Sequence, residues 1–209
     1  DLRDQNAELR LENERLQVRV AELQDEAARV ADLEDALGIT SEATAEQLLP
    51  ANVTARDSTI GHDVIRINVG SEHGIVNGQV VLSANGALIG TVTKVLPTQA
   101  NVQLLSDSRS IVNAEIETSR IQGNVAGTLD HKLTFNRAQG EIKVGERVVT
   151  SGLGGLYPPG KVIGIVSEVS GTPQDLFRSV KVEPIVRLST VETVLVITNF
   201  LPQRIDLDE

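Results

Sequence analysis

The first 37 residues carry an apolar side chain at every seventh position, without a break in the spacing. The positions that share this spacing are Leu2, Leu9, Leu16, Leu23, Val30 and Leu37. A sustained sevenfold repeat predicts a left-handed coiled coil, whereas a helix that packs on its own domain needs a broader apolar stripe. We therefore expect a coiled-coil helix over residues 1–38, with Gly38 just past its last turn, where glycine commonly ends helices.

The other core position of this heptad repeat contains polar residues. With the leucines at position d, position a is occupied by Asn6, Asn13, Val20, Ala27 and Glu34. Asparagine at position a lowers the stability of a coiled coil, but it fixes the register and favours two parallel strands. The sequence thus predicts a parallel homodimer, with Asn6, Asn13 and Val20 in its seam beside the residues at d. A helix packed on its own domain is the alternative, which the Glu, Arg and Gln residues at most other positions disfavour.

Beyond residue 40 the pattern changes to short apolar runs that are rich in β-branched residues and separated by turns. Strand-like runs lie at 64–69, 80–82, 88–95, 102–105, 111–116, 133–135, 147–150, 162–169, 180–186 and 191–198. The Asn85-Gly86 dipeptide between two of these runs is a strong short-range hairpin signal. No helical stretch is long enough for a crossover connection, so we expect antiparallel strands.

Two segments of the β region repeat one design. Gly90 follows Gly78 by 12 residues and Gly164 follows Gly145 by 19, so the second copy carries seven additional residues in its hairpin loop. The predicted fold is therefore mainly β: an N-terminal coiled-coil helix followed by two small antiparallel β-barrels. Expected boundaries are 1–38 for the helix, 39–50 for a linker, 51–118 for the first barrel, 119–199 for the second and 200–209 for a tail. The last strand closes the second barrel or returns to the first.

Composition narrows the possible functions. The 209 residues include 29 acidic and 19 basic ones, which gives a net charge of −10. This balance argues against non-specific binding to nucleic acid, because affinity for phosphate needs clustered Lys and Arg. The absence of cysteine excludes disulfides, thiolate catalysis and cysteine-ligated zinc. The chain shows neither a signal peptide nor an apolar run near the ~18 residues of a membrane span. Because it starts with Asp rather than Met, we expect further sequence upstream.

The sequence contains partial matches to catalytic and ligand-binding motifs, but each match lacks a residue that the motif requires. The segment from Gly155 to Lys161 matches the start of a phosphate-binding loop, but Val162 replaces the required Ser or Thr, and a strand rather than a helix is expected next. The three histidines lack the spacing of metal ligands. Ser151 is not in a nucleophile elbow. We therefore expect no catalytic residue, no bound metal and no cofactor.

The longer second hairpin loop, 152–160, is a candidate interaction site. It contains Leu153, Leu156 and the single tyrosine of the chain, Tyr157. Long loops on rigid β scaffolds often carry binding, and rigid aromatic residues are common in interface hot spots. The alternative is that Leu156 and Tyr157 point inward and plug a barrel end or the seam between the barrels, because the β region has few other large residues. Both interpretations stay open at this point.

Two stretches carry a family resemblance. The first runs from Asp63 to Val81 and continues through Gly86-Ala-Leu-Ile-Gly-Thr-Val92 and Val102-Gln-Leu-Leu-Ser-Asp107; the second is the segment 145–166, which contains Thr150-Ser-Gly-Leu-Gly-Gly155. With these motifs and the order helix, barrel, barrel, the chain resembles the extracytoplasmic region of the rod shape-determining MreC family over residues 1–199. Two mild departures are Glu146, where the family often has Asp, and Tyr157, where it often has Phe.

The resemblance implies a non-enzymatic scaffold that organises the lateral peptidoglycan synthesis complex and maintains rod cell shape. It implies a position on the outer face of the bacterial cytoplasmic membrane, with a single-pass anchor upstream of the present sequence. The implied partners are further copies of the chain, MreD and the class B penicillin-binding protein of the rod complex. MreB would be reached indirectly or through the missing N-terminal segment.

Two other classes of protein also contain a coiled coil with β-barrels or a pair of β-barrels. A periplasmic adaptor of an efflux or secretion system normally inserts a helical hairpin between the halves of a lipoyl-type domain, whereas the helix here lies at one end of the chain. An inactive double-barrel protease would require Ser, His and Asp side chains in triad geometry, which only coordinates can exclude.

Overall fold

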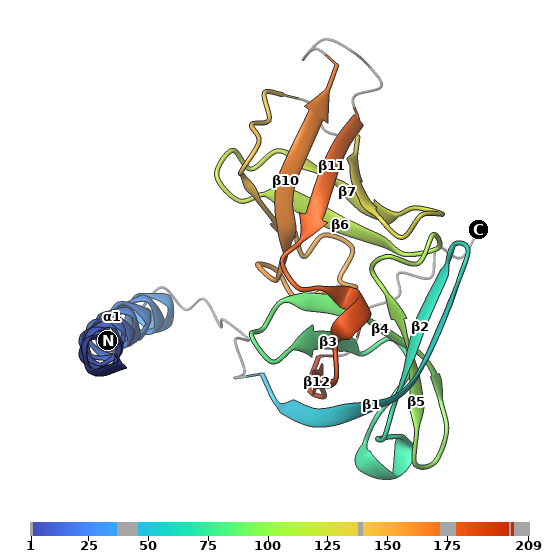
Figure 1. The fold of residues 1–209 in the computed structure, drawn as a ribbon, viewed down its shortest axis with the longest axis horizontal. Helices are drawn as coiled ribbons and strands as arrows, with labels where there is room; N and C mark the ends of the chain where they lie inside the picture. The colour runs from blue at the N-terminus through green and yellow to red at the C-terminus, as the bar shows by residue number, and fades with distance from the viewer. Residues whose placement is uncertain (1, 37–45, 138–139, 172–178, 201, 203–209) are drawn as a thin grey trace. The chain divides into compact units, whose positions relative to one another are not determined.

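The computed structural model describes residues 2–36, 46–137, 140–171, 179–200 and 202 (Figure 1). The chain divides into two units, Asp1–Ala45 and Glu46–Glu209. The first unit contains one long helix, α1, which spans Leu2–Ala36. Leu37 and Gly38, where we expected the helix to end, lie outside the described residues.

The first barrel is formed by six strands in the spatial order β1-β12-β3-β4-β5-β2, each antiparallel to its neighbours. These strands are β1 (Leu48–Thr59), β2 (His62–Ile67), β3 (Val80–Ser83), β4 (Leu88–Val95), β5 (Ala100–Leu104) and β12 (Thr193–Ile197). A short 3-10 helix, η1 (Ser71–His73), follows β2. The first expected hairpin is present, with β3 paired to β4 and Gly86 at a positive φ of 78° in the turn.

The second barrel has the order β10-β11-β8-β7-β6-β9, again with antiparallel neighbours. Its strands are β6 (Ile111–Ile116), β7 (Gln122–Gly127), β8 (Leu133–Asn136), β9 (Arg147–Thr150), β10 (Val162–Ser170) and β11 (Ser179–Pro184). A second 3-10 helix, η2 (Leu188–Thr190), lies between β11 and β12. The predicted fold class, a helix followed by two antiparallel barrels, is confirmed.

The internal repeat corresponds to equivalent strands in the two barrels. The amides of Gly78 and Gly145 donate to the carbonyls of Val92 and Val166, both at 2.8 Å. Gly90 of β4 and Gly164 of β10 face the neighbouring strand so closely that an added Cβ would lie 2.0 and 2.2 Å from a backbone carbonyl oxygen. Glycine is therefore required at both positions, because any side chain would collide with the adjacent backbone.

The barrel boundaries differ from the expected ones. β6 (Ile111–Ile116), which we placed in the first barrel at residues 51–118, pairs with β7 and β9 and belongs to the second. β12, near the end of the expected second barrel, follows the second of the two courses considered for the last strand: it returns to the first barrel and pairs with β1 and β3. β1 begins at Leu48, inside the expected linker. The first barrel thus closes only with a strand from the far end of the chain, because β1–β5 supply five of the six strands that closure needs.

Inward-facing apolar side chains, most of them aliphatic, fill both barrels. Among the fully buried ones are Ile65, Ile67, Val102 and Leu104 in the first barrel, and Val112, Ile116, Phe135, Val148 and Val180 in the second. The buried residues of the two barrels form one continuous cluster. The two barrels therefore share a hydrophobic core and are not joined only by a linker.

Candidate interaction surfaces and the junction between the barrels

The heptad positions of α1 that the structure describes are exposed. The exposed fractions of Leu9, Leu16 and Val20 are 64%, 59% and 52%. Asn13 accepts a hydrogen bond at 3.1 Å from Gln17 on the same helix, and Asn6 is also exposed. Apolar side chains in such a row have nothing to pack against on a single helix. The exposed row is therefore available for the partner helix that the heptad pattern predicts.

For three further seam residues the structure describes only the backbone. Leu2, Leu23 and Val30 lie in α1, but only their helical backbone is described. Two apolar residues off the seam, Leu11 and Val18, are also exposed, by 59% and 60%. In a two-stranded coiled coil they would stay at the outward position f. They provide a matched comparison for substitutions in the seam.

Tyr157 does not form an exposed anchor. Its side chain is only 9% exposed and belongs to the core cluster that joins the two barrels. Burial raises the pKa of the Tyr157 hydroxyl above its ordinary value, and a side-chain hydrogen bond with Thr91 of β4 acts in the opposite direction. Because Tyr157 comes from the second barrel and Thr91 from the first, this side chain plugs the seam between them. Tyr157 therefore agrees with the alternative of an inward-pointing plug, and its assignment as an exposed partner contact is wrong.

The other two apolar residues of the loop point outward. Leu153 is 50% exposed and Leu156 is 39% exposed. The loop beneath them is fixed at both ends: Thr150 Oγ1 donates to the Pro158 carbonyl at 2.5 Å, and Asn113 Nδ2 donates to the Leu153 carbonyl at 2.9 Å. The structure thus separates the three candidates into one buried plug and two exposed leucines on an ordered loop.

The segment that resembles a phosphate-binding loop has a structural role. Strand β10 begins at Val162, directly after Lys161, so no helix N-terminus is present to bind phosphate. Lys161 Nζ forms an ion pair at 2.6 Å with Glu46 Oε1, which precedes β1. This lysine therefore joins the second barrel to the start of the first.

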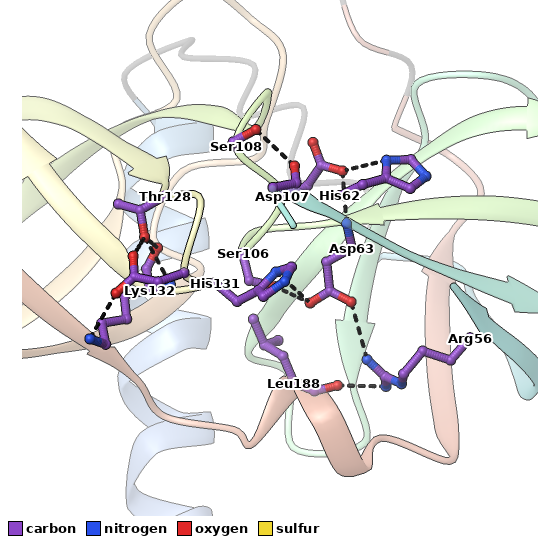
Figure 2. A network of polar contacts seen from close by, with 12 residues as sticks. Arg56, His62, Asp63, Ser106, Asp107, Ser108, Thr128, His131, Lys132 and Leu188 are labelled. Atoms are coloured by element: carbon purple, nitrogen blue, oxygen red, sulfur yellow. Dashed lines mark hydrogen bonds and ion pairs between the residues drawn. The ribbon is translucent and has the colours of Figure 1, made fainter. Parts of the chain in front are cut away.

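A network of polar side chains lies at the junction of the two barrels (Figure 2). Asp63 of β2 accepts a hydrogen bond of 2.5 Å from Ser106 and lies 3.5 Å from Arg56 Nη1. Arg56 also donates to the Leu188 carbonyl of η2 at 2.6 Å, which ties the returning connection to β1. His131, from the β7–β8 loop of the second barrel, approaches Asp63 to 3.9 Å. The network thus contacts both connections between the barrels.

Asp107 is the second buried carboxylate of this network, and its side chain is fully buried. It accepts hydrogen bonds from the Asp63 amide at 3.0 Å, from Gln103 Nε2 at 2.7 Å and from Arg109 Nε at 3.0 Å. Burial by itself raises the pKa of the Asp107 carboxyl, but the hydrogen bonds, with that of Arg109 foremost, outweigh burial and hold the pKa well below its usual range. Asp107 is therefore ionised at neutral pH and holds the β5–β6 connection in place.

Substituting Asp107 with asparagine should reduce stability in a pH-dependent way. A carboxyl whose pKa is lower in the folded than in the unfolded chain stabilises the fold above its unfolded pKa, about 3.9, and loses this effect as the pH falls. We expect Asp107→Asn to lower the free energy of unfolding by about 1–3 kcal/mol at pH 7. The difference from the parent should shrink below pH ~4.

The measurement is urea unfolding between pH 3 and 8. Asp130→Asn is the matched control, since Lys132 and Thr128 lower the pKa of Asp130 to about 2 on the exposed surface, where loss of the carboxylate should matter little. A stability difference for Asp107→Asn that stays constant across this pH range would contradict the role of the ionised carboxylate.

The junction brings a Ser, an Asp and a His together, but not as a catalytic triad. Ser106 Oγ donates to Asp63 rather than to a histidine, and Ser106 is only 2% exposed. A nucleophilic serine needs the imidazole as its hydrogen-bond acceptor and access to substrate. Ser151, the other serine considered, accepts a hydrogen bond from the Leu153 amide at 3.3 Å within its own turn. The arrangement at the junction therefore stabilises structure.

Among the residues that the structure describes, no group of His, Cys, Asp or Glu side chains is arranged to hold a metal ion. Over the same residues, no helix combines the length and the apolar character that crossing a membrane requires.

Comparison with known proteins identifies the family. The barrel core of the rod shape-determining protein MreC matches residues 53–198, which is most of both barrels. The chain belongs to the MreC family. A relative, the cell shape-determining protein MreC of Listeria monocytogenes, is 32% identical over 187 residues, which is 83% of this chain and 63% of the relative. MreC of Escherichia coli is 29% identical over 155 residues, which cover 73% of this chain and 42% of that protein. The chain thus spans less than two thirds of either relative.

Solved structures agree with this assignment. MreC from Listeria monocytogenes superposes with a TM-score of 0.81 at 28% identity and covers 95% of this chain and 97% of its own. The fold is also shared with MreC in a complex with the penicillin-binding protein PBP2 from Helicobacter pylori, with a TM-score of 0.56 at 19% identity and coverage of 73% and 99%. Membership in the MreC family also argues against the alternative of a periplasmic efflux or secretion adaptor.

Proposed function

We propose that this chain is a non-enzymatic scaffold that organises the lateral cell-wall synthesis complex and so maintains rod cell shape. The main support is the match of both barrels to MreC, since relatives of this family are named cell shape-determining proteins. The exposed heptad seam and the shared barrel core suit a scaffold, which needs an assembly surface and rigid modules. Labelling of Ser151 by a serine-reactive phosphonate would contradict the non-enzymatic part of the proposal.

The proposed partners follow from the family. They are a second copy of the chain through the α1 seam, the class B penicillin-binding protein of the rod complex, and MreD, with MreB contacted indirectly or through sequence upstream. The Helicobacter pylori complex of PBP2 with MreC supports the second of these partners. The proposed location is the outer face of the cytoplasmic membrane, with the anchor supplied by the upstream sequence.

We place the penicillin-binding protein contact at the loop that carries Leu153 and Leu156. Both leucines are exposed, and the hydrogen bonds made by Thr150 and Asn113 hold the loop in one conformation. A pre-ordered apolar surface loses little conformational entropy on binding, which favours affinity. The buried Tyr157 supports the loop from below without touching the partner.

Replacing Leu153 and Leu156 together with aspartate should weaken binding of the purified class B penicillin-binding protein ectodomain. If the two side chains together contribute at least ~2 kcal/mol to the binding free energy, their loss raises the dissociation constant roughly 30-fold. The measurement is interferometry with the immobilised chain. Val144→Asp is the control, since Val144 is 64% exposed in the same barrel but outside the loop.

Two results would count against the proposal. If the double aspartate variant binds like the parent, the loop is not the contact, although the scaffold function stands. If the folded parent chain does not bind this ectodomain at all, the proposed role in the synthesis complex fails.

A further inference from the structure

The outer face of the first barrel carries a groove of about 570 Å³ across strands β1, β2, β5 and β4. Its floor includes the apolar side chains of Ala55 and Val64 and the amides of Asn101 and Gln103. The charged residues that line it are Arg56, Asp57, Arg66, Lys94 and Arg109. Cations thus outnumber the lining carboxylate, on a chain whose net charge is −10.

Two of the four cations are already paired. Arg56 lies 3.5 Å from Asp63, and Arg109 contacts Asp107 at 3.0 Å, so these guanidinium groups neutralise buried carboxylates. Arg66 differs, since its Nε donates to the neutral Asn101 side chain at 3.3 Å. Within the described part of the chain, neither Arg66 nor Lys94 forms an ion pair, and both are exposed. They are the groups of the groove that are free to bind an anion.

The described part of the chain ends near this groove. Pro202, the last described residue, packs against Gly78, where an added Cβ would lie 3.0 Å from Pro202 Cγ. The Gly78 amide donates to the Val92 carbonyl at 2.8 Å. Val92 precedes Lys94 by only two positions on β4. Pro202 therefore lies beside the β4 edge of the groove.

The length and charge of the segment that follows Pro202 fit the groove. Residues 203–209 can span roughly 23 Å when extended, which is enough to cross the four strands at about 4.8 Å spacing. The segment contains Asp206, Asp208 and Glu209 against the single base Arg204. In an extended conformation alternate residues share a face, so Asp206 and Asp208 would point the same way.

We propose that the acidic segment 206–209 binds in the groove of the first barrel of the same chain, with its carboxylates paired to Arg66 and Lys94. Guanidinium and ammonium groups both form charge-assisted hydrogen bonds with carboxylates, and the amides of the floor are further donors. The inference is independent of the proposed penicillin-binding protein contact, which lies on the second barrel.

Zero-length carbodiimide coupling tests this inference, because it joins a lysine only to a carboxylate in direct contact. Light and ¹⁵N-labelled full-length chains are mixed in equal amounts, allowed to exchange, coupled, digested and analysed by mass spectrometry. We expect Lys94 to be coupled to Asp206, Asp208 or Glu209, in peptides of one isotope only. The Lys161–Glu46 pair, at 2.6 Å, is the internal positive control.

Charge reversal and salt provide the matched comparisons. Arg66→Glu should reduce the Lys94 coupling severalfold, and so should 0.5 M salt, which screens exposed ion pairs. Lys143→Glu should leave the coupling unchanged, since Lys143 is exposed on the second barrel. Mixed-isotope products at about half of the total, as random pairing of equal light and heavy chains gives, would overturn the inference in favour of the tail of a second copy. No coupling while Lys161 and Glu46 are joined, or coupling insensitive to both Arg66→Glu and salt, would also overturn it.

Discussion

Replacing Tyr157 with alanine should lower the free energy of unfolding of the barrel unit by about 2–4 kcal/mol. The side chain is 9% exposed and lies in the core cluster that the two barrels share, so its removal leaves a cavity at their seam. The hydrogen bond with Thr91 is lost as well. Because the second barrel supplies Tyr157 and the first supplies Thr91, the effect should extend to both barrels.

Urea unfolding followed by far-ultraviolet circular dichroism measures this change. Tyr157→Phe is the matched control: it keeps the ring and loses only the hydroxyl, which should cost about 0.5–1.5 kcal/mol. A Tyr157→Ala variant as stable as the parent would mean that the side chain does not fill the seam. Weaker binding of the penicillin-binding protein without a loss of stability would instead return Tyr157 to the role of a contact residue.

A double substitution of Leu16 and Leu23 with alanine should convert the proposed dimer into a folded monomer. Both residues occupy the d position of the predicted seam, and the described one, Leu16, is 59% exposed on the single helix. In a dimer each leucine would be buried against the partner helix, and each truncation of a buried leucine costs about 2–5 kcal/mol. Four such losses in one dimer exceed what a short seam with two asparagines can tolerate.

Sedimentation velocity measures the change in mass, and circular dichroism shows whether the barrels stay folded. Leu11→Ala with Val18→Ala is the matched control, because these residues are equally exposed on α1 but lie off the seam. This control should remain a dimer. A parent chain that sediments as a monomer, or equal dissociation of the control, would contradict the predicted seam.

Local patterns were sufficient for much of the fold. The sevenfold leucine spacing located α1, since a helix repeats its environment over a few residues. Asn85-Gly86 identified the β3–β4 hairpin, and the repeat beginning at Gly145 identified its counterpart in the second barrel. Each of these signals lies within a short stretch of sequence, which is why it could be recognised without coordinates.

The strands that close each barrel could not be predicted from such local patterns. Whether β6 or β12 completes the first barrel depends on which edge strands meet, and both strands are short and rich in apolar residues, so neither sequence identifies its partner strand. Tyr157 is buried in a cluster that includes residues of the first barrel, and these are far away in the sequence. The junction network joins Asp63, Ser106 and His131. Ser106 and Asp107 lie within a stretch that carries the family resemblance, but no rule on residue spacing predicts their contacts.

The proposed scaffold role depends most directly on parallel pairing of the helices, and one cysteine tests this. The chain has no cysteine, so Asn13→Cys introduces a single thiol at a seam position. In a parallel dimer the two copies of this residue face each other, within the roughly 4.4–6.8 Å between Cα atoms that a disulfide requires. Mild oxidation should therefore yield a disulfide-linked dimer that sediments like the parent. A variant that remains unlinked while the parent is a dimer would show that the helices do not pair in parallel.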